Sequence, residues 1–127
     1  MVKVLALATL ALATASPAVR PGSSQYGRVL FDSRGFVLYA FTHDGNGVSR
    51  CAGRCTKAWP PFVVRRPPTG RLLGAIRRAD GRLQVTYAGR PLYYYVGDTR
   101  PGQILCQNVR EFGGLWLVVR PDGSLVR

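Results

Sequence analysis

The chain repeats part of its own sequence. Residues 27–44 align without a gap on residues 81–98. The aligned identities are Gly27 with Gly81, Arg28 with Arg82, Gly35 with Gly89, Leu38 with Leu92, Tyr39 with Tyr93 and Asp44 with Asp98. A Cys and then a Trp follow at similar distances in both units, namely Cys51 and Trp59, then Cys106 and Trp116. This duplication predicts a fold built from two similar halves.

Each unit opens with a predicted β-hairpin. The runs "RVLFD" and "FVLYAF" flank the turn "SRG", and the runs "RLQVTY" and "PLYYYV" flank the turn "AGR". Asp80-Gly81 and Asp122-Gly123 predict two further turns. The helical signal is limited to about one turn within 51–59, which ends at Pro60-Pro61.

These patterns indicate an all-β fold, one small antiparallel sandwich or barrel-like domain over residues 26–127. Repeat 1 is expected at about 26–64 and repeat 2 at about 71–127. A proline-rich linker is expected at about 60–70, where four of the residues are proline. Residues 19–25 are expected to be a flexible segment before the domain.

The duplicated motif places aromatic side chains on strands and a carboxylate after each strand. Side chains alternate between the faces of a strand, so Tyr39 and Phe41 share one face, as do Tyr93 and Tyr95. Both faces of each strand are apolar or aromatic, which predicts strands that are covered on both sides. Asp44 and Asp98 follow the strand ends, where a carboxylate accepts turn N–H groups or a Tyr hydroxyl. A structural role is the favoured interpretation; the alternative is a pair of ligand sites related by pseudo-twofold symmetry.

The first residues are typical of an export signal. Lys3 gives a positive start, residues 4–12 are apolar but too short to span a bilayer, and small residues follow. We predict a signal peptide at 1–18, cut after Ala15 or Ala18. A lipid-attachment Cys does not follow the apolar stretch, so we expect a secreted, periplasmic or cell-envelope protein without a lipid anchor.

The charge is strongly positive, with 18 Lys and Arg against 6 Asp and Glu, a formal net charge of +12. Sixteen of the 18 are Arg. Such a charge attracts anionic envelope polymers or a membrane surface. The basic residues are scattered and no nucleic-acid motif is evident, so nucleic acid is not an expected partner; the sequence does not predict the oligomeric state.

Several segments resemble a bacterial family of predicted secreted proteins and lipoproteins, named for a repeated motif of Tyr, any residue, Phe/Trp/Tyr, two residues and Asp. These segments are "YAFTHD", "YYYVGD", "CAGRCTKAWPPF", "VTYAGRPLYYYVGD" and "GGLWLVVRPDG". The resemblance covers about 26–123. It implies export and a two-repeat plan; it implies no reaction, because no function of the family is established. The chain departs from the family in lacking the lipid-attachment Cys and in having Cys106 where a small residue is expected.

The three cysteines have three interpretations. Cys51 and Cys55 are separated by a spacing that closes a disulfide across a tight turn, which an oxidising compartment favours. Cys106 is then either free or paired with another chain. The alternatives are a Zn²⁺ site formed by His43 with the three cysteines, or a redox pair at Cys51 and Cys55.

The expected function is a non-enzymatic binding or structural module of the cell envelope. No catalytic triad spacing is evident, and no catalytic residue is assigned. Ligand contacts are expected from Arg side chains and from exposed members of an aromatic platform, namely Tyr39, Phe41, Tyr93, Tyr95, Trp59 and Trp116. The alternative is a metal-binding or thiol-redox protein that uses His43 and the cysteines.

Overall fold

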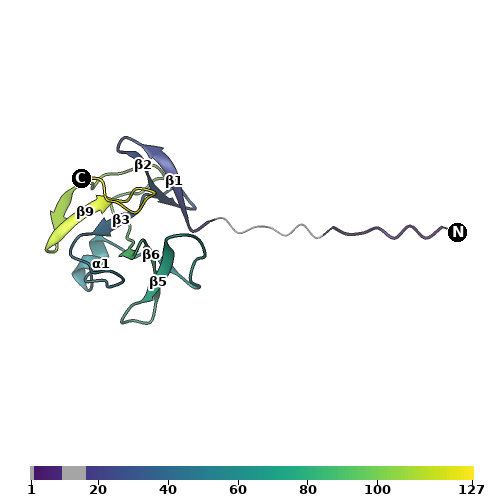
Figure 1. Ribbon diagram of the computed structural model, residues 1–127, viewed down its shortest axis with the longest axis horizontal. Helices are drawn as coiled ribbons and strands as arrows, with labels where there is room; N and C mark the ends of the chain where they lie inside the picture. The colour runs from purple at the N-terminus through teal and green to yellow at the C-terminus, as the bar shows by residue number, and fades with distance from the viewer. Residues whose placement is uncertain (1, 10–16) are drawn as a thin grey trace.

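The structure, a computed structural model, describes residues 2–9 and 17–127 (Figure 1). Residues 2–9 are exposed and contain no helix or strand. The predicted cut after Ala15 lies outside the described residues, and the signal peptide stays a prediction. The elements are β1 (Val19–Ser24), β2 (Gly27–Asp32), β3 (Tyr39–Phe41), α1 (Arg54–Ala58), β4 (Val63–Val64), β5 (Leu73–Arg77), β6 (Leu83–Tyr87), β7 (Arg90–Pro91), β8 (Val109–Glu111) and β9 (Gly114–Val118).

The described residues form an all-β fold with one short helix, as the sequence predicts. β1 pairs with β2, β3 with β9 and β9 with β8, all antiparallel. A further sheet has the order β4-β6-β5, and β7 also pairs with β6. Among the described residues, no helix is long and apolar enough to cross a membrane.

The prediction of a flexible segment at 19–25 is wrong. Val19–Ser24 is strand β1, and it pairs along its whole length with β2, from Val19 opposite Asp32 to Ser24 opposite Gly27. Residue Ser24 closes the turn, because its hydroxyl accepts the Tyr26 N–H and donates to the Gly27 carbonyl. The duplication itself explains β1: the β1–β2 hairpin of the first unit corresponds to the β5–β6 hairpin of the second.

The gapless alignment of the two units is off by one residue within β2 and β6. The Leu30 carbonyl accepts the Leu38 N–H, and the Val85 carbonyl accepts the Leu92 N–H. Leu38 and Leu92 are aligned, so Leu30 corresponds to Val85 and not to Gln84. The first unit therefore has one more residue in this hairpin turn, and a turn absorbs such an insertion without changing which face a strand residue occupies.

Each unit contributes its last strand to the other unit. Phe62 and Val119 each lie three residues after their unit's Trp. The Phe62 carbonyl accepts the Val85 N–H of the second unit, and the Val119 carbonyl accepts the Leu30 N–H of the first, both at 2.9 Å. Val63–Val64 then continues as β4 beside β6. The linker predicted at 60–70 is therefore wrong at its start, because residues 60–64 are part of the fold.

The prediction that the motif strands are covered on both sides is confirmed. Two clusters of buried side chains lie on opposite faces of the strands. One contains Tyr39, Phe41 and Tyr93; the other contains Leu38 and Leu92. The hairpin turns at 80–81 and 122–123 are also confirmed, as is the single helical turn of α1.

The glycine that opens each motif hairpin lies against the other unit. Gly35 has a φ of 91°, and its carbonyl accepts the Gly102 N–H at 2.9 Å. Gly89 has a φ of 78°, and its carbonyl accepts the Gly47 N–H at 2.7 Å. A Cβ on Gly35 would lie 3.1 Å from the Cβ of Pro101. Glycine is therefore required at both positions for two reasons: the backbone is left-handed there, and the two units lie in close contact.

Replacing Gly35 with alanine is expected to lower the free energy of unfolding by about 2 kcal/mol, because strain at positive φ and contact with Pro101 act together. Chemical denaturation measures the change. Gly27 is the matched control, because it has a φ of 85° with open space around it. An equal loss in Gly27→Ala would show that the contact between the units contributes nothing.

Candidate functional site

The Tyr and Asp of the repeated motif are joined across the two units. The Tyr39 hydroxyl donates to Asp98 Oδ2 at 2.7 Å, and the Tyr93 hydroxyl donates to Asp44 Oδ2 at 2.8 Å. The backbones of Tyr39 and Tyr93 exchange two N–H···O bonds, both of 2.9 Å. A pseudo-twofold axis therefore passes between the two tyrosines, and each carboxylate receives the hydroxyl of the other unit.

The second oxygen of each carboxylate holds its own loop. Asp44 Oδ1 accepts the Arg50 N–H at 2.7 Å, and Asp98 Oδ1 accepts the Leu105 N–H at 2.8 Å. Arg50 and Leu105 each precede a cysteine, which confirms that the two loops correspond. Both structural roles expected for the motif Asp, fixing a turn and accepting a Tyr hydroxyl, are confirmed.

The third motif position completes an aromatic stack at the centre of the protein. Trp59 and Trp116 lie face to face, with ring centroids 4.1 Å apart and an interplanar angle of 4°. Phe41 stacks on Trp116 at 4.1 Å, and Tyr95 lies against Trp59 at 4.9 Å. Each motif aromatic therefore packs on the Trp of the other unit. Such contacts add to the gain from burial alone.

Each motif tyrosine meets the Trp of its own unit edge to face. Tyr39 and Trp59 have centroids 5.1 Å apart at 77°, and Tyr93 and Trp116 have centroids 5.0 Å apart at 88°. All four of these residues have an exposed fraction of 0%. The prediction of an exposed aromatic platform is therefore wrong for them and for Phe41, which is 3% exposed. Tyr95 is only partly buried.

Burial shifts the pKa values of the Tyr and Asp side chains of the motif. It raises the pKa of Asp98, and the hydrogen bonds from Tyr39 and the Leu105 N–H act in the opposite direction. Burial likewise raises the pKa of Asp44, opposed by the bonds from the Arg50 N–H and Tyr93. Burial also raises the pKa of Tyr39 and Tyr93 well above that of a free phenol. Both tyrosines therefore remain protonated donors at neutral pH.

The predicted disulfide is present. Cys51 and Cys55 are bonded, with their Cα atoms 5.3 Å apart, and Cys106 is free and buried. Cys106 occupies the place of Cys51 in the second unit, where Arg110 stands four residues later instead of a second cysteine. Burial raises the pKa of the Cys106 thiol, which disfavours the reactive thiolate.

The zinc and redox alternatives both use Cys51 and Cys55, which are bonded to each other. Two of the four proposed zinc ligands are joined in the disulfide, and in the described part of the chain no group of three His, Cys, Asp or Glu residues could hold a metal ion. The His43 ring packs edge-on against Phe41 at 5.7 Å. The disulfide fixes the loop that precedes α1, and its sulfurs are buried with the core.

Replacing both Cys51 and Cys55 with serine is expected to lower the free energy of unfolding by about 2 kcal/mol, the chain-entropy value for a loop this short. Thermal unfolding with and without reductant measures it. Wild-type protein in reductant should match the double variant. Cys106→Ser is the control and should respond to reductant as wild type does; a reductant effect lost in Cys106→Ser would contradict the assignment of the disulfide.

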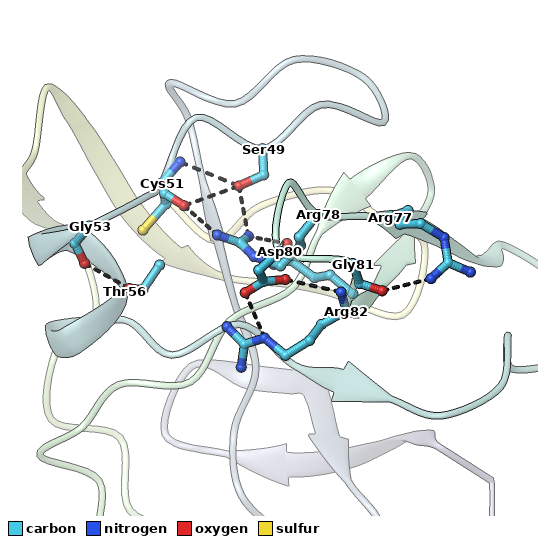
Figure 2. Close-up of polar contacts among 10 residues, drawn as sticks. Ser49, Cys51, Gly53, Thr56, Arg77, Arg78, Asp80, Gly81 and Arg82 are labelled. Carbon is cyan, nitrogen blue, oxygen red and sulfur yellow. Dashed lines mark hydrogen bonds and ion pairs between the residues drawn. The ribbon is translucent and has the colours of Figure 1, made fainter.

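Sequence reasoning missed one residue, Arg78 (Figure 2). Its guanidinium donates to Gln84 Oε1 at 2.6 Å, to Ser49 Oγ at 3.1 Å and to the Cys51 carbonyl at 2.7 Å. Ser49 Oγ lies 2.7 Å from the hydroxyl of Tyr93. Arg78 therefore connects the β5–β6 turn to the disulfide loop and to the motif. The Arg77-Arg78 pair carries no sequence signal that distinguishes this partly buried Arg from its exposed neighbour.

One cleft is lined in part by residues of the motif. A cleft of 260 Å³ lies between the loop after β3 and the β6–β7 turn, and its lining includes Asp44, Asn46 and Arg90. None of its described lining residues is Ser, Cys or His. The Asp44 carboxylate already accepts two hydrogen bonds there, and the Arg90 Nε donates to the Gly123 carbonyl.

A comparison with protein families agrees with the duplication. The model of the Lipoprotein_15 family, a secreted repeat of unknown function, matches residues 22–63 and 74–120, one stretch in each unit. No curated protein and no solved structure matches the chain. The family match covers more than half of the chain and coincides with the two interlocked units. The protein therefore belongs to this family of secreted repeats of unknown function, and it consists of two copies of the repeat.

Proposed function

We propose that this secreted protein is a non-catalytic module that binds anionic polymers of the cell envelope through its arginines. The aromatic and acidic residues of the motif are used inside the fold, where they join the two units. The surface that remains for a partner is therefore dominated by positive charge. The motif residues join the two units inside the fold, and the arginines remain on the surface. This arrangement supports a binding role for the surface.

The observation that carries the proposal is the position of the acidic residues. Asp32 and Asp98 are buried, at 3% and 8% exposed, and Asp44 is half-buried against Tyr93. Glu111 accepts the indole N–H of Trp59, while Asp80 and Asp122 hold hairpin turns. Each acidic residue thus accepts hydrogen bonds within the fold, and few carboxylates remain to neutralise the arginines.

The basic residues show the complementary pattern. Among the described residues, only Arg34 and Arg82 form ion pairs, with Asp32 and Asp80 respectively. Most other basic side chains are exposed without a carboxylate partner; they include Arg20, Arg28, Arg54, Lys57, Arg65, Arg66, Arg71, Arg77, Arg100, Arg110 and Arg127. A net charge of +11 remains once Lys3 is set aside from the formal +12. Such a surface attracts polyanions over about a Debye length.

Retention on polymer-coated matrices tests this proposal. The exported protein should bind matrices that carry polyphosphate or a sulfated polysaccharide at low salt and elute as the salt concentration rises. A neutral dextran matrix is the control and should not retain it. Equal retention on neutral and anionic matrices, or none on either, would refute the proposal.

A further inference from the structure

Five arginines lie together at one end of the β4-β6-β5 sheet. The last paired row of this sheet joins Val64, Leu83 and Arg77 on the three strands. Beyond that row, the Arg78 N–H donates to the Arg82 carbonyl at 2.8 Å, and Arg65 directly follows Val64. We call this sheet end the arginine rim; it consists of Arg65, Arg66, Arg77, Arg78 and Arg82.

The rim combines one anchored guanidinium with four exposed ones. Arg78 is held by its bonds to Gln84, Ser49 and Cys51. The other four members of the rim are exposed. Figure 2 shows Arg78 directed toward Ser49 and Cys51, whereas Arg77 and Arg82 bond to Gly81 and Asp80 of the turn. The rim is therefore a fixed centre of charge surrounded by four exposed guanidiniums, of which Arg65 and Arg66 form no side-chain bond in the described structure.

Helix α1 adds positive charge beside the rim. A hollow of 190 Å³ separates the start of the helix from the turn, lined by Gly53 and Thr56 on one side and by Arg78 and Arg82 on the other. The helix carries Arg54 and Lys57, both exposed. The one carboxylate at the turn is Asp80, which already pairs with Arg82 at 2.7 Å.

We propose that the arginine rim is the binding site for a linear phosphate-bearing polymer. This proposal rests on the proposed function and assigns it a place and a ligand class. A guanidinium binds phosphate through two parallel N–H groups, which the ammonium of lysine does not reproduce. The basic residues at this sheet end are all arginine, with no lysine among them.

The dimensions and surroundings of the rim favour a linear polymer over a bilayer. Three adjacent strand ends span about 10 Å, two interstrand spacings, which suits a few consecutive charges of a chain. An interfacial membrane site also needs apolar side chains to insert among the lipids. None of the large exposed apolar residues of the domain belongs to the rim itself; they are Val48, Leu72, Val96, Leu105 and Phe112.

The test compares two triple variants that lose the same charge. Arg65→Gln/Arg66→Gln/Arg77→Gln changes the rim, and Arg20→Gln/Arg28→Gln/Arg110→Gln changes exposed arginines outside it. Binding of defined-length inorganic polyphosphate is measured by titration calorimetry over a range of salt concentrations. The rim variant should bind about tenfold or more weakly, with a salt slope reduced by about 2, because each lost phosphate contact releases fewer counterions. The control should change by about threefold at most.

The outcomes separate this proposal from the broader one. Equally weakened polyphosphate binding in both variants would overturn the assignment of the rim as the binding site. The proposed function would remain. If the wild type binds a sulfated polysaccharide but not polyphosphate, the proposal of a phosphate-bearing ligand is overturned, and the proposed binding of anionic polymers is not. Rim-dependent binding to anionic phospholipid vesicles without binding to polyphosphate would also overturn the proposal of a linear phosphate-bearing polymer. Circular dichroism checks folding; if the triple variant is unfolded, Arg65→Gln/Arg66→Gln against Arg20→Gln/Arg28→Gln gives the same comparison.

Discussion

Replacing Trp116 with alanine is expected to lower the free energy of unfolding by about 4 kcal/mol, the range measured for large aromatic residues in protein cores. Trp116 is fully buried and contacts three other rings of the stack, on Phe41, Trp59 and Tyr93. Its loss removes contacts in both units, so small relaxations cannot fill the space. Urea denaturation followed by circular dichroism measures the change.

Phe112→Ala is the matched control for this prediction, because Phe112 is 44% exposed. Its free energy of unfolding should change by less than about 1 kcal/mol, as is usual for surface positions. Trp59→Ala should resemble Trp116→Ala, since the two rings are related by the pseudo-twofold axis. A loss below about 1 kcal/mol in both Trp variants would contradict the central position of the stack.

Replacing Tyr39 with phenylalanine is expected to cost about 2 kcal/mol, because the buried Asp98 then lacks one of its two donors. Tyr26→Phe is the control, since Tyr26 is partly buried and its hydroxyl has no hydrogen bond in the described structure. Thermal and urea unfolding should show almost no change in the control. A loss in Tyr39→Phe no larger than that in Tyr26→Phe would contradict the role of the bond.

The same variant has a predicted pH dependence. Burial already places the folded-state pKa of Asp98 above the ordinary value of 3.8 for an Asp side chain, and loss of the Tyr39 hydroxyl should raise this pKa further. A raised pKa gives Asp98 a stabilising contribution below pH 3.8 that is lost as pH rises through the folded-state pKa. The deficit of Tyr39→Phe should therefore be larger at neutral pH than in acid. NMR titration of the Asp98 carboxyl carbon measures the shift directly.

The fold class and the local elements are predictable from the sequence because they depend on neighbouring residues. Alternating apolar and aromatic residues predict strands around Tyr39 and Tyr93 that are covered on both sides. The spacing of Cys51 and Cys55 predicts a disulfide by tight-turn geometry. Asp44 and Asp98 are predicted as turn-fixing carboxylates, because a strand ends just before each of them.

The exchange between the units is not predictable from one sequence. A pairing of Tyr39 with its own Asp44 has the same residues as the pairing with Asp98, and only the three-dimensional arrangement distinguishes them. The prediction of an exposed aromatic platform is wrong for the same reason. The residue that covers Phe41 is Trp116, which lies 75 positions later in the chain. Strand β1 is missed because "VRPGSS" has little β propensity, and pairing with β2 overrides it.

The interlocked arrangement explains why both copies of the motif are kept. A single unit would expose its Trp, its motif aromatic and the carboxylate that its partner normally satisfies. Burial of these groups requires the second copy, as in repeat proteins whose units cannot bury their apolar faces alone. The motif of each unit is then required for folding.

A double-mutant cycle tests the central claim, that the motif joins the two units. Tyr39→Phe is combined with Asp98→Asn in one cycle and with Asp44→Asn, in the same unit, in the other. The structure predicts a coupling energy of about 1–2 kcal/mol between Tyr39 and Asp98, which share a hydrogen bond, and about zero between Tyr39 and Asp44. Coupling of Tyr39 to Asp44 and not to Asp98 would contradict this claim, because it would show that each motif Tyr bonds to the Asp of its own unit.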